Sequence, residues 1–167
     1  LLRFLFNLFV LFLKRNQSER ANYQGTNLNL IDTKIGPFTF LGSIFLNKED
    51  YLSNRIEPEL ILHEMAHQKQ WHSLDILLME LASAIFWFNP FIYLFKRQIK
   101  ANHEFLADEF VIKAGAAPHT YSEKLLYHTF PDKMSGLASG FNHLLIKQRL
   151  IMLSQFQKKK PSRFRYF

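Results

Sequence analysis

The chain has 167 residues, a length that suits one domain with a sizeable hydrophobic core. It contains no cysteine, which excludes a disulfide framework and a thiolate metal site, so any bound metal must have histidine and carboxylate ligands. The formal net charge is +7, 48% of the residues are hydrophobic, and 18 are phenylalanine. No recognisable nucleic-acid-binding module accompanies this basic excess, so it indicates membrane lipid as a partner and no direct contact with nucleic acid.

The first segment, "LLRFLFNLFVLFLKR", is almost entirely apolar until Lys14 and Arg15. It is too short to cross a bilayer, because a spanning helix needs about 20 residues. The chain also begins with Leu1, so we interpret it as a piece of a longer protein. We expect residues 1–15 to be the end of a transmembrane helix that starts before this piece. The basic residues at its end predict that this end lies on the cytoplasmic side.

A polar stretch, residues 16–29, precedes the segment "IGPFTFLGSIFLN". In that segment, glycine and proline interrupt a run of Phe, Thr and Ile, a pattern that predicts two short β-segments. Pro37 predicts that one of them is an edge strand, because proline cannot donate to a β-ladder. An edge strand within residues 37–46 offers a surface on which an extended peptide can pair.

The segment "EPELILHEMAHQK" predicts a helix that begins near Pro58 and carries a metal-binding pattern. Residues four apart share one face of a helix, so His63 and His67 can direct ring nitrogens at the same ion. Glu64 is displaced around the helix and can approach the open position of that ion without binding it. This is the arrangement of a zinc hydrolase, in which the carboxylate takes a proton from water. By itself, the pattern also occurs by chance on helices.

Catalytic zinc usually has a third protein ligand, and "NHEFLADEF" offers one. Glu104 and Asp108 lie four apart in a predicted helix, so Glu104 can bind the ion while Asp108 orients a ligand histidine from behind. The alternative is a solvated acidic helix face. Apolar neighbours such as Phe105 and Val111 argue against that alternative. For His103, next to Glu104, we expect a surface or packing role.

The second apolar block, residues 74–95, is long enough to cross a bilayer, but a single crossing would separate Glu104 from the two histidines. Asp75, Glu80 and the Asn89–Pro90 pair also argue against a plain span. We therefore predict a helix that breaks near "FNP" and returns. It is expected either to be buried in the domain or to lie against the membrane interface, where its aromatic residues would suit the headgroups.

Helix is predicted to resume through residues 96–113, to break at Gly115 and Pro118, and to form again at 120–129. The segment "FNHLLIKQRLIMLSQF" has the spacing of an amphipathic helix. The last ten residues, 158–167, form a basic run with aromatics, which indicates a cytoplasmic juxtamembrane segment. Downstream of the two motifs, Tyr127, His128 and His143 are each candidates to stabilise an oxyanion. For each of them taken singly, ordinary packing is the favoured interpretation.

The combination of "HEMAH" with "EFLAD" resembles the gluzincin metallopeptidases, in which a downstream glutamate completes the zinc site. The segments "FWFNPFIYLFKRQIKANHEFLAD" and "FNHLLIKQRLIML" extend the likeness. Over most of residues 30–155 the chain is similar to the BlaR/MecR-type membrane peptidases, the beta-lactam sensor-transducers and their relatives. This resemblance implies His63, His67 and Glu104 as zinc ligands and Glu64 as the general base. It also implies a peptidase domain that faces the cytoplasm and cleaves itself or a transcriptional repressor.

Together these observations predict a mostly helical α+β domain, gluzincin-like, with a small edge β-element and association with a membrane. Residues 16–157 are expected to be the cytoplasmic zinc peptidase domain of a bacterial inner-membrane signal transducer. Its expected partners are Zn²⁺, a peptide or protein substrate, lipid, and a second copy in a homodimer. Two rival hypotheses are a housekeeping membrane zinc protease of the ExxAD class and a non-catalytic signalling scaffold that contains zinc.

Overall fold

The computed structural model describes residues 10, 15–16, 18–32, 36–129 and 140–158. The chain divides into two compact units, Leu1–His103 and Glu104–Phe167. The boundary falls inside helix α5 (Pro90–Lys113), which continues without a break through it. The architecture is mostly helical α+β, as the sequence predicts, and its small mixed sheet has four strands where two β-segments were predicted.

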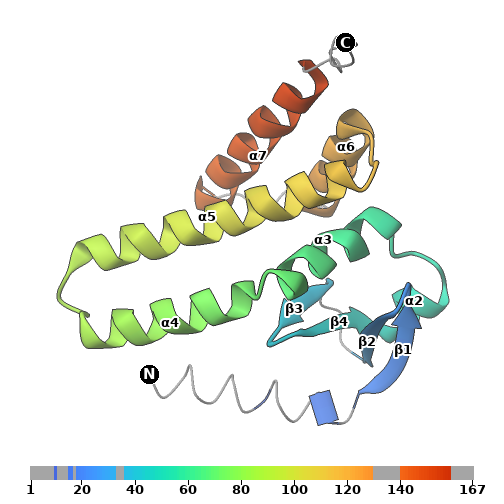
Figure 1. Cartoon of the computed structure of the whole chain (residues 1–167), viewed down its shortest axis with the longest axis horizontal. Coiled ribbons are helices and arrows are strands. Elements are labelled where there is room, and N and C mark those ends of the chain that lie inside the picture. The colour runs from blue at the N-terminus through green and yellow to red at the C-terminus, as the bar shows by residue number, and fades with distance from the viewer. Residues whose placement is uncertain (1–9, 11–14, 17, 33–35, 130–139, 159–167) are drawn as a thin grey trace, which may run out of the picture. The chain divides into compact units, whose positions relative to one another are not determined.

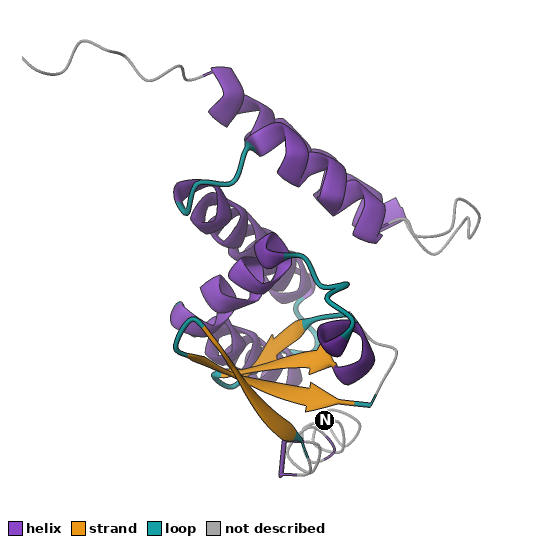
Figure 2. Cartoon of the chain, turned by 90° about the vertical axis from the view of Figure 1, so that its right-hand side faces the viewer, coloured by secondary structure: helices purple, strands orange, loops and turns teal. Residues whose placement is uncertain are grey.

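The first unit contains a four-stranded sheet with the order β1-β2-β4-β3. Its strands are β1 (Glu19–Tyr23), β2 (Thr26–Ile31), β3 (Phe38–Phe40) and β4 (Ser43–Asn47), drawn in orange in Figure 2. β1 pairs antiparallel with β2, β2 parallel with β4, and β4 antiparallel with β3. β3 follows Pro37 and lies at the edge of the sheet, which confirms the predicted edge strand.

Two strands occupy the polar stretch where the sequence analysis expected no element. β1 and β2 form a hairpin in which Tyr23 pairs with Thr26, leaving a two-residue loop. Both loop residues, Gln24 and Gly25, have positive φ (49° and 79°), as the favoured tight hairpin turns require. β1 is mostly exposed, and most of its side chains are polar. It therefore lacks the alternation of apolar and polar residues that predicts a strand.

The core of the first unit lies between the sheet and helix α3 (Pro58–Lys69). On β2 and β4, alternate apolar residues such as Leu28 and Ile44 are fully buried. They cluster with Ile61 and Met65 of α3, one turn apart on the same helix face. A short helix, α2 (Lys48–Leu52), joins the sheet to α3 and was not expected from the sequence. The core thus fixes the helix that carries the histidine pair against the sheet.

Helix α4 (His72–Ile85) follows α3 after Trp71, which adopts a left-handed conformation. The chain then turns at residues 86–89 and returns along α5, so that α4 and the first part of α5 run antiparallel (Figure 1). The predicted break at "FNP" is therefore confirmed. The alternative of burial within the domain is wrong, because the large side chains around this turn are exposed in the chain.

The second unit consists of the rest of α5 with α6 (Pro118–Thr129) and α7 (Gly140–Lys158), which contact each other. Helix α5 ends at Lys113, and Gly115 has the positive φ (105°) that is common just after a helix C-terminus. The predicted breaks and both downstream helices are confirmed. Buried here are Val111, Tyr121 and Leu153, together with the charged side chains of Asp108 and Arg149.

Among the helices that the structure describes, none is both long and apolar enough to cross a membrane. The predicted transmembrane end, residues 1–15, and the predicted juxtamembrane run, 158–167, lie almost entirely outside the described residues. These two assignments, and the domain limits at 16 and 157, stay predictions.

Candidate metal centre

Helix α3 carries both histidines of the "HEMAH" motif on one face of the first unit. Pro58 is its first helical residue, and regular helical spacing puts residues 63 and 67 one turn apart. The Nε2 atoms of His63 and His67 lie 3.1 Å apart. Their rings meet edge to face, with centroids 4.8 Å apart. The two ring nitrogens therefore converge on one point.

This separation suits two ligands of one cation. Zinc–nitrogen bonds are about 2.0–2.1 Å long, and tetrahedral coordination then separates two bound nitrogens by about 3.3 Å. Two nitrogen lone pairs that face each other at 3.1 Å repel unless a proton or a cation lies between them. The imidazole pair fits zinc in both donor type and spacing.

A chain of hydrogen bonds fixes the tautomer of His67. The carbonyl Oε1 of Gln70 lies 3.1 Å from His72 Nε2, and because a carbonyl oxygen only accepts, that nitrogen of His72 carries the proton. In a neutral His72, Nδ1 must then accept, and its partner at 2.7 Å is Nδ1 of His67. His67 therefore donates through Nδ1 and keeps a lone pair on Nε2, the atom that faces His63.

His72 is itself held by His103. The two rings stack with centroids 3.9 Å apart and planes 12° apart, and both side chains are buried. His103 Nε2 lies 2.8 Å from Asp75 Oδ2 on α4. The packing role expected for His103 is confirmed, and the surface role is not. The stack holds His72 in the position from which it bonds His67.

In the second unit, Glu104 and Asp108 share one partner, Arg149 of α7. The Nη1 atom of Arg149 lies 2.7 Å from Glu104 Oε2. Its Nε and Nη2 atoms donate to the two oxygens of Asp108 at 2.8 and 2.6 Å, a bidentate pair. The hydroxyl of Tyr121 also donates to Asp108, at 2.7 Å. Asp108 is fully buried, so this charge is stabilised entirely by such partners.

These charges perturb the groups around them. Burial lowers the pKa of Arg149, but the bonds and negative charge of Asp108, with the charge of Glu104, outweigh burial and raise that pKa above its ordinary value. Burial and the negative charge of Asp108 together raise the pKa of Tyr121. Arg149 stays charged and Tyr121 stays protonated over the physiological range.

Glu104 follows His103 directly on α5. His63, His67 and Glu104 each offer one ligand atom, and these atoms all lie within 4.8 Å of one another. Two imidazoles and one carboxylate form a ligand set found in catalytic zinc sites, where a fourth position is kept for water or substrate.

A family model described as BlaR1 peptidase M56 matches residues 43–153, more than half of the chain. The chain belongs to the BlaR1 peptidase M56 family. The family resemblance predicted from the sequence is confirmed. Regulatory protein BlaR1 of Staphylococcus aureus is 29% identical to it, over 79% of this chain and 25% of the relative. The chain thus spans about a quarter of that relative's length, and no solved structure matches it.

The region matched by the M56 model contains every residue of the predicted site. Glu64 is buried, and its backbone carbonyl accepts a hydrogen bond of 2.9 Å from Thr39 Oγ1 on β3. The edge strand is thereby joined to the histidine helix at the glutamate. That Glu64 acts as a base, and that Asp108 orients a ligand histidine, stay predictions.

Sequence reasoning missed how four residues support the site in this M56 domain, although it expected a surface or packing role for the second of them: His72, His103, Tyr121 and Arg149. The first two precede and follow a long apolar block, so no spacing rule relates them to each other. Arg149 is distant in sequence from Asp108, in a segment for which the sequence predicted only an amphipathic helix. The one available signal was spacing: Arg149 lies three residues after Ile146 and four before Leu153, on the helix face that is buried.

Two of the three oxyanion candidates lie on the surface of the second unit. Tyr127 and His128 are exposed on α6 and contact each other with ring centroids 5.7 Å apart. The side chain of His143 lies outside the described residues. Ordinary surface contact describes the first two as well as catalysis does.

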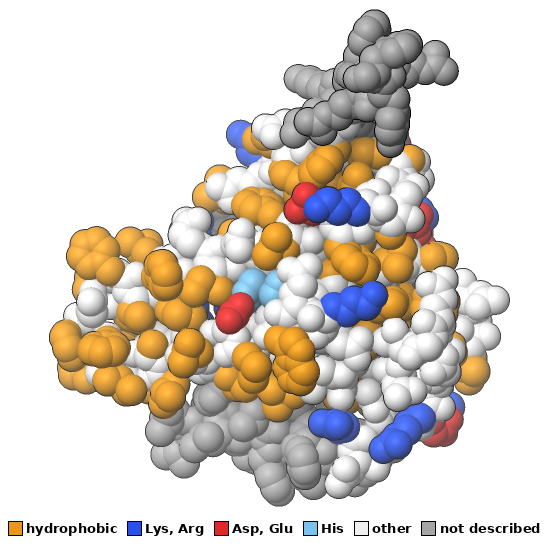
Figure 3. All heavy atoms as spheres, in the orientation of Figure 1, with side chains coloured by type: hydrophobic (Ala, Val, Ile, Leu, Met, Phe, Trp, Pro, Cys, Tyr) orange, Lys and Arg blue, Asp and Glu red, His pale blue; other side chains and the backbone are white. Residues whose placement is uncertain are grey.

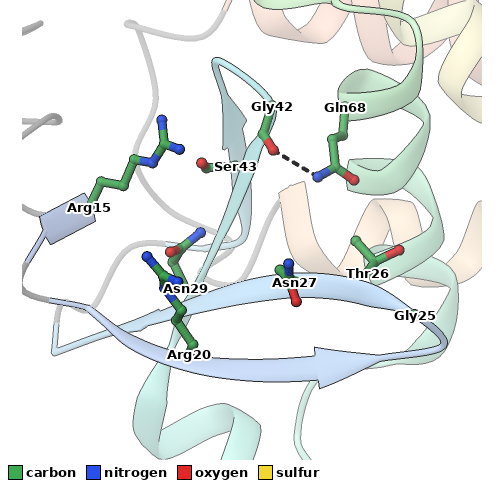
Figure 4. Close-up of a pocket in the computed structure, with 9 residues that line it drawn as sticks. All are labelled: Arg15, Arg20, Gly25, Thr26, Asn27, Asn29, Gly42, Ser43 and Gln68. Carbon is green, nitrogen blue, oxygen red and sulfur yellow. Dashed lines mark hydrogen bonds between the residues drawn. The ribbon is translucent and has the colours of Figure 1, made fainter.

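A separate pocket of about 360 Å³ opens between the β1–β2 hairpin, β4 and α3 (Figure 4). Arg15 and Arg20 line it together with polar side chains such as Asn29 and Ser43. Gln68 of α3 closes one side by donating to the carbonyl of Gly42 at 2.8 Å. Among the described residues, the lining contains no histidine or carboxylate, so it does not offer the usual ligands of a metal cation.

Proposed function

We propose that this chain is the zinc metallopeptidase domain of a membrane-tethered signal transducer. His63, His67 and Glu104 would hold Zn²⁺, and Glu64 would act as the general base. The observation that carries the proposal is the meeting of two motifs about forty residues apart, with candidate ligand atoms within 4.8 Å. Membership of the M56 peptidase family supports the same chemistry.

Different residues of the chain have different proposed roles in peptide hydrolysis. A bound zinc ion would polarise the scissile carbonyl and lower the pKa of water to about 7. Glu64 takes the proton of the attacking water and passes it to the leaving amine. His72 holds His67 in the tautomer that offers its Nε2 lone pair. Arg149 and Asp108 fix the part of α5 that carries Glu104.

The substrate is proposed to bind as an extended strand beside β3. This strand is at the sheet edge and is tied to Glu64 through Thr39, so a peptide added there would run next to the general base. Backbone hydrogen bonds to an edge strand tolerate many side chains. Such a site would accept a protein segment rather than a small molecule.

The regulatory role is the finer part of the proposal. The name of the Staphylococcus aureus relative describes a regulatory protein, and the family match supports this class over a housekeeping ExxAD protease. We propose a substrate that is either the protein itself or a regulator such as a transcriptional repressor. The proposed location is the bacterial inner membrane, with the peptidase domain on the cytoplasmic side.

Zinc content tests the site. Purified wild type is expected to hold about one zinc per chain, and both His63→Ala and Glu104→Ala are expected to lose it. His119→Ala is the matched control, because His119 is an exposed histidine on α6 that pairs with Glu123. Zinc that survives Glu104→Ala at wild-type affinity would refute the three-ligand site.

Glu64→Gln separates a peptidase from a scaffold in which the zinc only supports structure. The substitution keeps the size of a buried side chain but removes the base. Zinc content is expected to stay unchanged, while self-cleavage and cleavage of added peptide fall by about a hundredfold or more. Signalling that continues in cells with this variant would favour the scaffold.

A further inference from the structure

We propose that the turn between α4 and α5 inserts into one leaflet of a lipid bilayer and anchors the domain at the membrane surface. The element is the hairpin tip, defined as residues 81–95. This inference does not depend on zinc or on peptidase activity, because it rests on the surface of the tip alone.

The hairpin tip is apolar and exposed. It contains no charged residue, and hydrophobic side chains cover that end of the first unit in Figure 3. Trp87 and Phe91 are 71% and 73% exposed. Its exposed aromatic residues are Phe86, Trp87, Phe88, Phe91, Tyr93 and Phe95. A cluster of this kind is far more than the scattered apolar residues of an ordinary surface.

Three side chains of the hairpin tip form local hydrogen bonds with backbone groups. Ser83 donates to the carbonyl of Met79 at 2.7 Å, and the Asn89 side chain accepts from the Phe91 backbone at 3.0 Å. Tyr93 donates its hydroxyl to the carbonyl of Trp87 at 3.1 Å, across the turn. Each of these bonds lowers the cost of moving that polar group from water into hydrocarbon.

A charged residue lies at each end of the hairpin tip, one on α4 and one on α5, and the two contact each other. Glu80 ends the charge-free segment on α4 and Lys96 ends it on α5, and their side chains form an ion pair of 2.5 Å. Exposed Lys100 follows one turn later, as a positive charge for anionic headgroups. About five helical residues on each side lie beyond the pair, which gives a depth of about 8 Å. That depth agrees with the 5–10 Å at which interfacial helices sit.

The distribution of apolar side chains favours lipid over a protein partner. Tyr93, Leu94 and Phe95 are all exposed, and three consecutive helical residues point in directions spread over about 200°. A second copy or another protein would cover one face and leave the opposite side in water. Hydrocarbon surrounds the tip from every direction and removes all of this surface from water.

A mostly apolar hollow of about 470 Å³ adds room for an acyl chain between the two helices. Its apolar lining includes Leu78, Met79, Phe95 and Ile99. Its polar lining consists of Asp75, Gln98, Asn102 and His103, and the Asp75–His103 pair supports His72.

The two tryptophans of the chain provide the test. Trp87 lies in the tip, whereas Trp71 is exposed at the junction of α3 and α4. Trp71→Phe leaves Trp87 as the sole fluorophore, and Trp87→Phe leaves Trp71 as the matched control. Each full chain is bound to phosphatidylethanolamine–phosphatidylglycerol vesicles, isolated by flotation, and quenched with lipids brominated at defined acyl positions.

The expected result is strong quenching of Trp87, deepest with bromines in the upper half of the acyl chain, and little quenching of Trp71. Adding Phe88→Glu and Phe91→Glu is expected to reduce the quenching of Trp87 at least about twofold, because charge is expelled from hydrocarbon. The control pair Tyr127→Glu and Ile151→Glu, at exposed apolar positions of α6 and α7, should leave it unchanged.

Three outcomes would overturn the proposal. Failure of the chain to float with vesicles would exclude membrane anchoring by the tip. Unquenched Trp87 in floated protein would put the tip outside the bilayer, and blue-shifted emission would then indicate cover by protein. If the blue shift of Trp87 emission depended on protein concentration, the tip would be covered by a second copy of the chain. If the shift did not depend on concentration, the tip would be covered by the apolar segment 1–14 of the same chain. Equal quenching of Trp71 and Trp87 would show that insertion is not confined to the tip.

Discussion

Arg149 Nη1 lies 2.7 Å from Glu104 Oε2, while two other nitrogens of the same guanidinium bind Asp108. One buried cation therefore joins two carboxylates that are a helical turn apart on α5. Two negative charges close together, one of them fully buried, are unfavourable, and the positive charge of Arg149 offsets part of that cost. The C-terminal helix α7 is thereby coupled to the proposed zinc ligand.

Replacing Arg149 by methionine is expected to lower the free energy of unfolding by about 3–5 kcal/mol, because the fully buried Asp108 loses its charge partner. Urea denaturation measures the loss. Arg55→Met is the matched control, since Arg55 pairs with exposed Glu49 and Asp50, and a change below about 1 kcal/mol is expected there. The double variant Arg149→Met with Asp108→Leu should recover much of the stability. A small effect of Arg149→Met alone would mean that the pair does not stabilise the second unit.

Tyr121 gives the fold a dependence on alkaline pH. Its raised pKa, caused first by burial and then by Asp108, means that the folded protein keeps a proton that the unfolded chain loses near pH 10. The stability linked to this proton is fully present below about pH 10 and falls above it, by about 1.4 kcal/mol per pH unit.

Tyr121→Phe should remove this slope. The measurement is urea denaturation from pH 8 to pH 11, compared as the difference between wild type and variant. That difference should be constant below pH 9 and shrink above pH 10. Exposed Tyr127, replaced by Phe, should leave the wild-type profile unchanged. Parallel profiles of wild type and Tyr121→Phe would contradict the assigned proton.

The sequence was sufficient for the elements that carry strong local signals. Pro58 and the acidic residues around it fixed the start of α3, and "FNP" fixed the break between α4 and α5. Spacing along single helices also singled out the candidate ligands. The residues that support the candidate ligands could not be predicted from the sequence, because their contacts depend on tertiary packing. His72 meets His103 across two helices, and Arg149 reaches Asp108 from a helix forty residues away.

The β1–β2 hairpin was missed because its strands lie beside water on one face and its turn has an uncommon first residue. Asn-Gly or Gly-Gly would have announced a two-residue hairpin, whereas this chain has Gln24-Gly25. Gln24 holds a φ of 49°, which is strained for a residue with a long side chain.

The same geometry predicts that Gln24→Asn stabilises the protein by several tenths of a kcal/mol to about 1 kcal/mol, because Asn adopts left-handed conformations more readily. Gly25→Val should destabilise it by about 1–2 kcal/mol, since valine is strained at a φ of 79° although no atom lies within 4 Å of an added Cβ. Thermal denaturation of both variants measures the effect. If Gly25→Val were neutral, the turn would not have the conformation described.

His72 is the residue whose replacement best tests how the candidate ligand His67 is oriented. His72→Phe keeps an aromatic ring to stack on His103 but removes the acceptor for His67 Nδ1. His67 then loses the bond that fixes its tautomer and ring orientation, and zinc affinity is expected to fall by about 10–100-fold.

Competition with a chromophoric chelator measures that affinity, and His119→Phe, at an exposed position, is the control. A fall in affinity with an unchanged unfolding midpoint of the metal-free protein would assign His72 a positioning role. Unchanged affinity would mean that His67 needs no such partner, and the tautomer argued from Gln70 would be wrong. A loss of stability equal to the loss of affinity would instead make His72 a packing residue. The three results are distinct, because stability and zinc affinity are measured separately on the same variant.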